Sequence, residues 1–181
     1  MNADTLRTAL RALGIELQRR GVQGDLYVVG GAAMALAYDA RRSTREIDAI
    51  FEPKLVIYEA AARVADDLGL LPDWLNDGAK RFLVGEDPYQ APVLEFPGVR
   101  VQMASPQMLL ALKVAAARIG EDDDDVATLA GMLGLRRAAD VLELVTAVAG
   151  ASRLGPRSRF FVEEIMDRTL IAEGTEPISH S

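Results

Sequence analysis

The stretch from Leu26 to Phe51 constrains the fold of this chain more than any other segment. In it, a pair of glycines and a polar loop separate segments that prefer different secondary structures. A short apolar run, Leu26–Val29, ends at two adjacent glycines, Gly30 and Gly31. The helix-forming segment Ala32–Tyr38 follows, and a polar loop leads to a second strand-like segment, Glu46–Phe51. The order strand, glycine turn, helix, loop and strand predicts an α/β fold.

The second strand carries two acidic residues, Glu46 and Asp48. Successive side chains of a strand point to opposite faces, so both carboxylates are expected on one face and the apolar Ile47 and Ala49 on the other. Mg²⁺ is commonly bound by one or two carboxylates and takes its remaining ligands from water and substrate phosphates. The spacing therefore predicts a site for a divalent cation.

Gly30 and Gly31 have two interpretations. Glycines are common between a strand and a helix, so the pair is explained by the turn alone. Alternatively, a backbone without Cβ atoms at the start of a helix lets a phosphate group approach the backbone N–H groups. Glu46 and Asp48 in the next strand favour this second interpretation.

The glycine pair followed by Thr44–Ala49 resembles the glycine-rich turn and DxD motif of the nucleotidyltransferase superfamily. More narrowly, it is similar to the minimal bacterial group that includes AbiEii-like and MenT-like toxins. The resemblance covers most of the chain, and it continues through four further segments: Asp73–Asp77, Ala104–Pro106, Leu109–Lys113 and Pro156–Phe160. One position departs from the pattern, because the family usually has Asp where this chain has Glu46, and the extra methylene moves the carboxylate by about a bond length at a metal with strict geometry.

The resemblance implies a nucleotidyltransferase-like mixed sheet flanked by helices, with an all-helical C-terminal part. It implies an enzyme that moves a nucleoside monophosphate from a nucleoside triphosphate to an acceptor hydroxyl, at the 3′ end of a tRNA or on a protein. It also implies a toxin neutralised by an antitoxin. Glu46 and Asp48 would hold Mg²⁺ or Mn²⁺, and Gly30, Gly31 and Lys113 would bind the triphosphate.

Three further assignments concern charged side chains. The resemblance implies an acidic pair, Asp124 and Asp125, that orients Lys113 or a neighbouring arginine. The arginines before the acidic strand form either a solvated loop or a phosphate contact, and Arg45 is the member that we assign to phosphate. Superfamily members often carry a third metal carboxylate on a later strand, for which Glu95 is the weak candidate in this chain.

Lys113 lies in an otherwise apolar helix, Gln107–Arg118, without an acid one turn away. Its ammonium group either extends to water or needs a partner from outside the helix. Candidates are Glu46, Asp48, the acidic run Glu121–Asp125 and a bound triphosphate, of which we favour the triphosphate. Helical spacing leaves the core face of this helix complete without Lys113, so Lys113→Met is expected to be thermally neutral.

Most of the other elements follow from apolar periodicity and turn residues. Trp74 and Asn76 are candidates for contact with a nucleotide base. For Trp74 the alternative is a place in the core. The segments predicted are a helix over Asp4–Arg20 capped by Asp4, a helix over Lys54–Leu68, a short strand at Arg81–Val84, a hairpin of Pro92–Phe96 with Val99–Met103, and helices over Gln107–Arg118, Asp124–Leu133, Ala138–Val148 and Arg157–Leu170. We expect a nucleotidyltransferase-like core at 1–105, a helical part of the same compact unit at 106–172, and a disordered tail at 173–181.

Composition narrows the functional classes. The chain has 181 residues and contains no cysteine, which excludes disulfides, thiolate metal sites and cysteine nucleophiles. His180, the one histidine, is in the polar tail, where a frayed terminus is a better explanation than a catalytic base. The net charge of −7 argues against nonspecific nucleic-acid binding. Without a long apolar run or a signal peptide, the chain is expected to be cytoplasmic, with no membrane partner.

The residues leave a second functional class open. A protein that keeps this fold but has drifted from the catalytic pattern would bind a nucleotide or a partner without turnover. Glu46 and the missing strand carboxylate are compatible with such a module. Metal-dependent binding of a nucleoside triphosphate without turnover would distinguish it from an enzyme.

Overall fold

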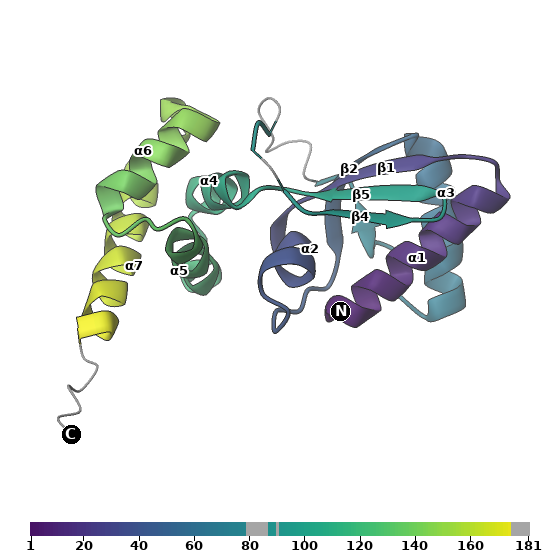
Figure 1. Cartoon of the computed structure of the whole chain (residues 1–181), viewed down its shortest axis with the longest axis horizontal. Coiled ribbons are helices and arrows are strands. Elements are labelled where there is room, and N and C mark those ends of the chain that lie inside the picture. Colours follow the sequence, from purple (N-terminus) through teal and green to yellow (C-terminus); the bar gives the residue numbers. More distant parts are fainter. Residues whose placement is uncertain (79–86, 90, 175–181) are drawn as a thin grey trace, which may run out of the picture. The chain divides into compact units, whose positions relative to one another are not determined.

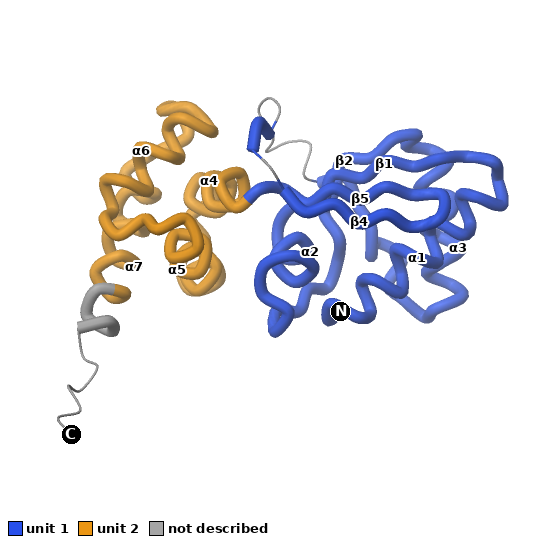
Figure 2. Tube along the Cα trace, in the orientation of Figure 1, with its two compact units in different colours: residues 1–105 blue, residues 106–181 orange. Residues whose placement is uncertain are grey.

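A computed structural model describes residues 1–78, 87–89 and 91–174 of the chain. The described residues form a mixed α/β protein with a five-stranded mixed sheet and seven α-helices (Figure 1). The chain divides into two compact units, Met1–Ser105 (unit 1) and Pro106–Ser181 (unit 2) (Figure 2). The strand predicted at Arg81–Val84 and nearly all of the predicted tail lie outside the described residues.

Unit 1 contains the sheet. Its elements are, in chain order, α1 (Ala3–Arg19), β1 (Gly24–Val28), α2 (Gly30–Ala33), the π-helical turn η1 (Met34–Tyr38), β2 (Ile47–Glu52), α3 (Lys54–Leu68), β3 (Leu75–Asn76), β4 (Val93–Phe96) and β5 (Val99–Met103). The strand order is β3-β2-β1-β5-β4. β1 pairs antiparallel with β2 and parallel with β5, while β2 pairs parallel with the short β3.

One face of the sheet forms the core of unit 1. Burial alternates along β1, β2 and β5, so every second side chain of these strands is buried. The apolar faces of α1 and α3 cover this side, since a Cβ on Gly24 of β1 would lie near Leu17 of α1 and Ile57 of α3. The core of this unit includes Leu6, Leu10, Leu13 and Leu17 of α1 and Ile57, Ala60, Ala61 and Val64 of α3.

The N-cap predicted for the first helix is wrong. Asn2 is the N-cap of α1, and its side chain accepts a hydrogen bond from the N–H of Thr5. Asp4 instead lies in the first turn, where its negative charge stabilises the helix dipole.

Unit 2 consists, in its described part, of α4 (Pro106–Ala116), α5 (Asp123–Met132), α6 (Ala138–Ala149), the 3₁₀ turn η3 (Ala151–Arg153) and α7 (Pro156–Gly174). α4 packs against each of the other three α-helices of this unit. Val114, Leu129, Val141 and Phe161, one from each helix, are buried in its core. In the described part of both units, no helix has the length and apolar character needed to cross a membrane.

Candidate active site

The acidic residues of the second strand lie on the face of the sheet opposite the helical core. Along β2, Ile47, Ala49 and Phe51 are buried, whereas Asp48 is half-buried on the other face. Glu46 directly precedes the strand, and its carbonyl oxygen accepts a hydrogen bond from Thr44 Oγ1 at 3.1 Å. The backbone of Asp48 is fixed by the N–H of Val29, which donates to the Asp48 carbonyl at 2.9 Å. The alternation predicted from the sequence is therefore present.

The environment of Glu46 disfavours its charged form. Partial burial raises the pKa of the Glu46 carboxyl above its usual range, and the negative charges of Asp48 and Asp73 raise it further. Arg45 acts in the opposite direction. Three acidic side chains thus concentrate negative charge at one place on unit 1, which a bound cation would neutralise.

The glycine turn approaches these carboxylates closely. Gly30 has φ +62°, a left-handed conformation that residues with a Cβ rarely adopt, and a Cβ at this position would lie 3.5 Å from Asp48 Oδ2. A Cβ on Gly31 would lie 3.2 Å from Thr44 Oγ1, which is tighter than ordinary contact. The start of α2 therefore lies beside the acidic strand. Because both residues are glycines, no side chain of theirs fills the space between the helix and the strand.

A third segment contributes to the site from the edge of the sheet. Asn76 of β3 pairs in register with Asp48, and its Nδ2 donates to Glu46 Oε2 at 3.0 Å. A base contact was one interpretation of Asn76 from the sequence, and the structure shows that its side chain contacts the predicted metal ligand Glu46. Trp74 belongs to the core: it is fully buried, and its Nε1 donates to the Ala61 carbonyl at 2.9 Å.

A polar pocket of about 260 Å³ opens beside Glu46. It is lined by Arg45, Glu46, Leu71 and Asp73. Its volume is close to the lower end of the range of about 300–1,000 Å³ that is typical of ligand sites. Arg45 is exposed and lines this pocket, so it is the positively charged residue among the four.

The donor set fits a hard divalent cation. Within the described ranges, no group of three or more His, Cys, Asp or Glu side chains is arranged to hold a metal ion. Mg²⁺ does not require such a cage, because one or two carboxylates suffice when substrate phosphates and water complete its shell. Glu46 and Asp48 supply these two carboxylates, and both are oxygen donors of the kind that Mg²⁺ and Mn²⁺ prefer.

Glu95 cannot serve as a third metal ligand. It lies on β4, and the strand order places β4 three strand spacings from β2, which is about 14 Å. Its carboxylate instead pairs with Arg100 Nε at 3.3 Å, the residue opposite it on β5.

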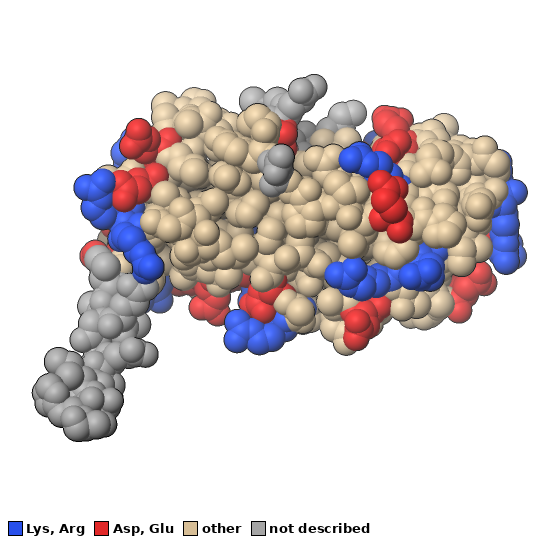
Figure 3. Space-filling view, viewed as in Figure 1, with Lys and Arg blue, Asp and Glu red and all other residues tan. Residues whose placement is uncertain are grey.

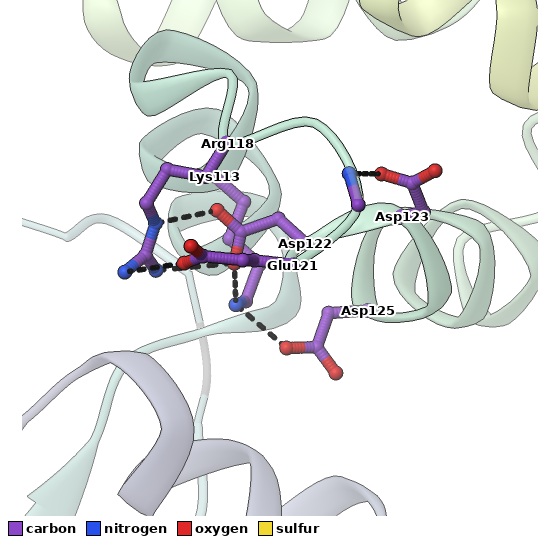
Figure 4. Close-up of polar contacts among 7 residues, drawn as sticks. Lys113, Arg118, Glu121, Asp122, Asp123 and Asp125 are labelled. Atoms are coloured by element: carbon purple, nitrogen blue, oxygen red, sulfur yellow. Dashed lines mark hydrogen bonds and ion pairs between the residues drawn. The ribbon is translucent and has the colours of Figure 1, made fainter.

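Lys113 forms a buried ionic cluster in unit 2. Its side chain is 6% exposed, so the interpretation in which the ammonium group reaches water is wrong. The Nζ atom lies 2.8 Å from Asp122 Oδ1 and 2.6 Å from Asp125 Oδ2, two carboxylates that are themselves buried. Figure 4 shows the ammonium group between these two acids. The partner from outside the helix is thus supplied by the acidic run.

The other charges of the run have different roles. Arg118 Nε donates to Asp122 Oδ2 at 2.9 Å, so Asp122 joins Lys113 to Arg118. Asp123 accepts from the N–H of Gly120 and from Arg168 of α7. Asp124 is exposed, so Asp125 and not Asp124 is the member of the predicted pair that contacts Lys113.

A polar cluster centred on Asp87 was not predicted from the sequence. The Asp87 carboxylate accepts hydrogen bonds from Tyr27 Oη at 2.7 Å and from Ser105 N and Oγ, both at 2.8 Å. Burial, followed by the hydrogen bond to Asp87, raises the pKa of Tyr27, so its hydroxyl remains a donor. The cluster joins β1 to the last residue of unit 1, and its members are too far apart in the sequence to form a motif.

Comparisons of this chain with protein-family models, with curated proteins and with solved structures gave no match.

Proposed function

We propose that the chain is a metal-dependent nucleotidyltransferase that moves a nucleoside monophosphate from a nucleoside triphosphate to an acceptor hydroxyl. The observation that carries the proposal is the position of Glu46 and Asp48, two carboxylates on the open face of the sheet beside the glycine turn at Gly30. The raised pKa of Glu46 supports it, because the mutual repulsion of acids is relieved when a cation binds.

The residues of unit 1 have distinct roles in this reaction. Glu46 and Asp48 would hold Mg²⁺ or Mn²⁺, which when bound supplies positive charge for the attacking and leaving oxygens. The backbone at Gly30 and Gly31 would admit the triphosphate, and Arg45 would bind a phosphate oxygen. The acceptor hydroxyl oxygen forms a bond to the α-phosphorus while the bond to the leaving pyrophosphate breaks, and the hydroxyl proton passes to water.

The roles of Lys113, Asp124 and Asp125 at the triphosphate rest on the sequence resemblance alone. The contacts of Lys113 described above are all within unit 2, where it fixes the turn between α4 and α5. Lys113 remains a proposed phosphate-binding residue on the ground of that resemblance, and the roles proposed for the residues of unit 1 do not depend on it.

The acceptor is proposed from the same resemblance: the 3′ end of a tRNA or a hydroxyl group of a protein. A role as a toxin neutralised by an antitoxin belongs to the same proposal. On the face drawn in Figure 3, basic and acidic side chains are interspersed and no broad basic patch forms. Together with the net charge of −7, this favours recognition of one terminus or side chain over a grip along a nucleic-acid backbone.

A transfer assay tests the proposal. Purified protein is incubated with each nucleoside triphosphate labelled at the α-phosphate, with Mg²⁺ or Mn²⁺, and with total RNA or total protein. We expect label in one macromolecular fraction with at least one nucleotide, and loss of labelling with EDTA. The absence of transfer with all four nucleotides and both metals would contradict the proposal.

The alternative is a binding module with the same fold and no turnover, which is favoured by Glu46 at the usual Asp position. The discriminating variant is Glu46→Asp, which restores the usual residue. An enzyme transfers the nucleotide in at least one of the two forms. The shorter side chain keeps or raises this activity, unless the pocket is tuned to Glu, in which case the activity falls. A binding module binds the nucleotide together with the metal, but it transfers nothing as the wild type or as Glu46→Asp.

A further inference from the structure

The side chain of Asn76, at the edge of the sheet, makes two hydrogen bonds that define its contact with Glu46. Asn76 Nδ2 donates to Glu46 Oε2 at 3.0 Å, and Asn76 Oδ1 accepts from the N–H of Gly78 at 2.9 Å. Both ends of the amide are therefore engaged, and a flipped amide would place its oxygen against the carboxylate. The hydrogen bonds allow one orientation, with the donor toward Glu46.

The backbone that carries Asn76 is held firmly by the core. β3 consists of two residues, and Leu75 of this strand is buried beside Ile47. The N–H of Ile47 donates to the Trp74 carbonyl at 2.6 Å, and the Trp74 ring is fully buried. A strand of this length is retained because of these buried neighbours, which fix the position from which Asn76 reaches Glu46.

The turn after Asn76 is shaped around the same side chains. A Cβ on Gly78 would lie 2.9 Å from Asn76 Oδ1 and 3.5 Å from Asp48 Oδ1, so a larger residue would displace the amide. Asp77 between them is held by Lys54 Nζ and by Tyr58 Oη of α3. Asn76 thus contacts the carboxylate of Glu46, and Gly78 lies near that of Asp48. Asp77, between them, is bound to side chains of α3.

We propose that Asn76 is a positioning residue that fixes the Glu46 carboxylate for binding of Mg²⁺. Glu46 has one methylene more than Asp and hence one more rotatable bond, which its hydrogen bond to Asn76 restrains. Mg²⁺ requires near-ideal octahedral geometry, whereas Ca²⁺ accepts flexible arrangements of oxygen ligands. Asn76 therefore supports selectivity for the smaller ion. This inference rests on the proposed function, because it takes Glu46 as a ligand.

The test measures metal binding by the full chain without turnover. Free Mn²⁺ is followed by electron paramagnetic resonance in the presence of a nucleoside triphosphate, and Mg²⁺ and Ca²⁺ affinities are obtained by displacement. Replacement of residues that orient metal ligands typically costs about 10–100-fold in affinity. We expect a loss of this size for Mg²⁺ in Asn76→Ala and a clearly smaller loss for Ca²⁺.

Three controls make the result specific. Asn76→Val removes the donor but keeps a residue that suits a strand, and it replaces Asn76→Ala if the alanine variant lacks a wild-type melting curve. Asp77→Ala, on the same turn, should leave both affinities unchanged. In a Glu46→Asp background the shorter side chain no longer reaches Asn76, so Asn76→Ala should cost little more.

Each outcome has a separate meaning. If the wild type binds no Mn²⁺ with any nucleotide, the proposed function fails together with this inference. If the wild type binds Mn²⁺ and the Asn76 variants bind all three ions equally well, only the role of Asn76 is overturned. An equal loss for Mg²⁺ and Ca²⁺ that persists in the Glu46→Asp background would show that Asn76 merely stabilises the edge strand, and would also overturn the inference.

Discussion

The surroundings of Glu46 are unfavourable to its negative charge. Burial, Asp48 and Asp73 all raise its pKa. Natural proteins tolerate such local cost mainly at functional sites, where a ligand relieves it. At the residue scale, the cation site is therefore expected to cost stability when no cation is bound.

The change Glu46→Gln should raise stability at neutral pH. The folded state of the wild type binds the Glu46 proton more tightly than the unfolded state does, because the folded pKa is raised above the usual value of 4.5. Above the folded pKa the charged carboxylate costs stability, and this cost disappears as the pH falls through the folded pKa to the usual value. We expect the variant to be more stable by less than about 1 kcal/mol at pH 7, with the gap closing in acid.

Urea denaturation at several pH values, with and without Mg²⁺ and nucleotide, measures this difference. Added metal should stabilise the wild type and have less effect on the glutamine variant, because only a ligand bound to the folded state shifts the equilibrium. A variant that is less stable than the wild type at neutral pH would contradict the account of Glu46.

At the scale of elements, close backbone contact decides how α1 lies on the hairpin of β4 and β5. A Cβ on Gly14 of α1 would lie 2.2 Å from the Pro97 carbonyl oxygen, and a Cβ on Gly98 would lie 2.1 Å from the Gly14 carbonyl oxygen. The helix and the turn therefore approach each other through two glycines, and no side chain fits between them.

Gly14→Ala should destabilise the protein by about 1–3 kcal/mol or more, since the added methyl group meets backbone that cannot move aside. The matched control is Gly131→Ala in α5, where a Cβ would meet nothing within 4 Å. There the lower flexibility of alanine should add about 0.5–1 kcal/mol. Urea denaturation of both variants checks the pair, and changes of the same sign would contradict the packing described.

The ionic cluster of α4 and α5 gives a second prediction at this scale. Lys113→Met leaves the buried Asp122 and Asp125 without the ammonium group, and removal of one partner from a buried pair typically costs about 3–5 kcal/mol. Burial thus reverses the sequence-based expectation that this variant is thermally neutral. Arg137→Ala removes an exposed pair with Asp140 and should cost no more than about 1 kcal/mol. Equal free energies of unfolding for the two variants would refute a structural role of Lys113.

The elements also show what local sequence can predict. The bounds of α3 equal the predicted Lys54–Leu68, because its apolar period is regular and Gly69 ends it. The strands of the hairpin follow from two β-rich runs around Pro97-Gly98. By contrast, β3 was missed, since two residues carry no period and their extended form depends on pairing with β2. The contact of Asn76 with Glu46 was unpredictable for the same reason.

At the scale of the whole molecule, the candidate site rests on sheet topology. Asp48 and the Gly30 turn are close because β2 lies next to β1 in the sheet, which places the end of β1 opposite the start of β2. Alternation within β2 could be predicted from the sequence, and so could the face shared by Glu46 and Asp48. Strand order could not, and it is the strand order that removes Glu95 from the site. The central claim therefore depends on two carboxylates and one turn of unit 1.

Transfer of the α-phosphate label by wild type and Asp48→Asn is the measurement that tests this claim most directly. Asparagine keeps the size of Asp48 and one of its two acceptor oxygens but removes the charge that would hold the cation, so the fold should remain intact. We predict labelled product and released pyrophosphate for the wild type, and loss of both for Asp48→Asn with an unchanged circular-dichroism spectrum and a melting temperature no lower than that of the wild type. Full transfer by the folded Asp48→Asn variant would contradict the assignment of the site.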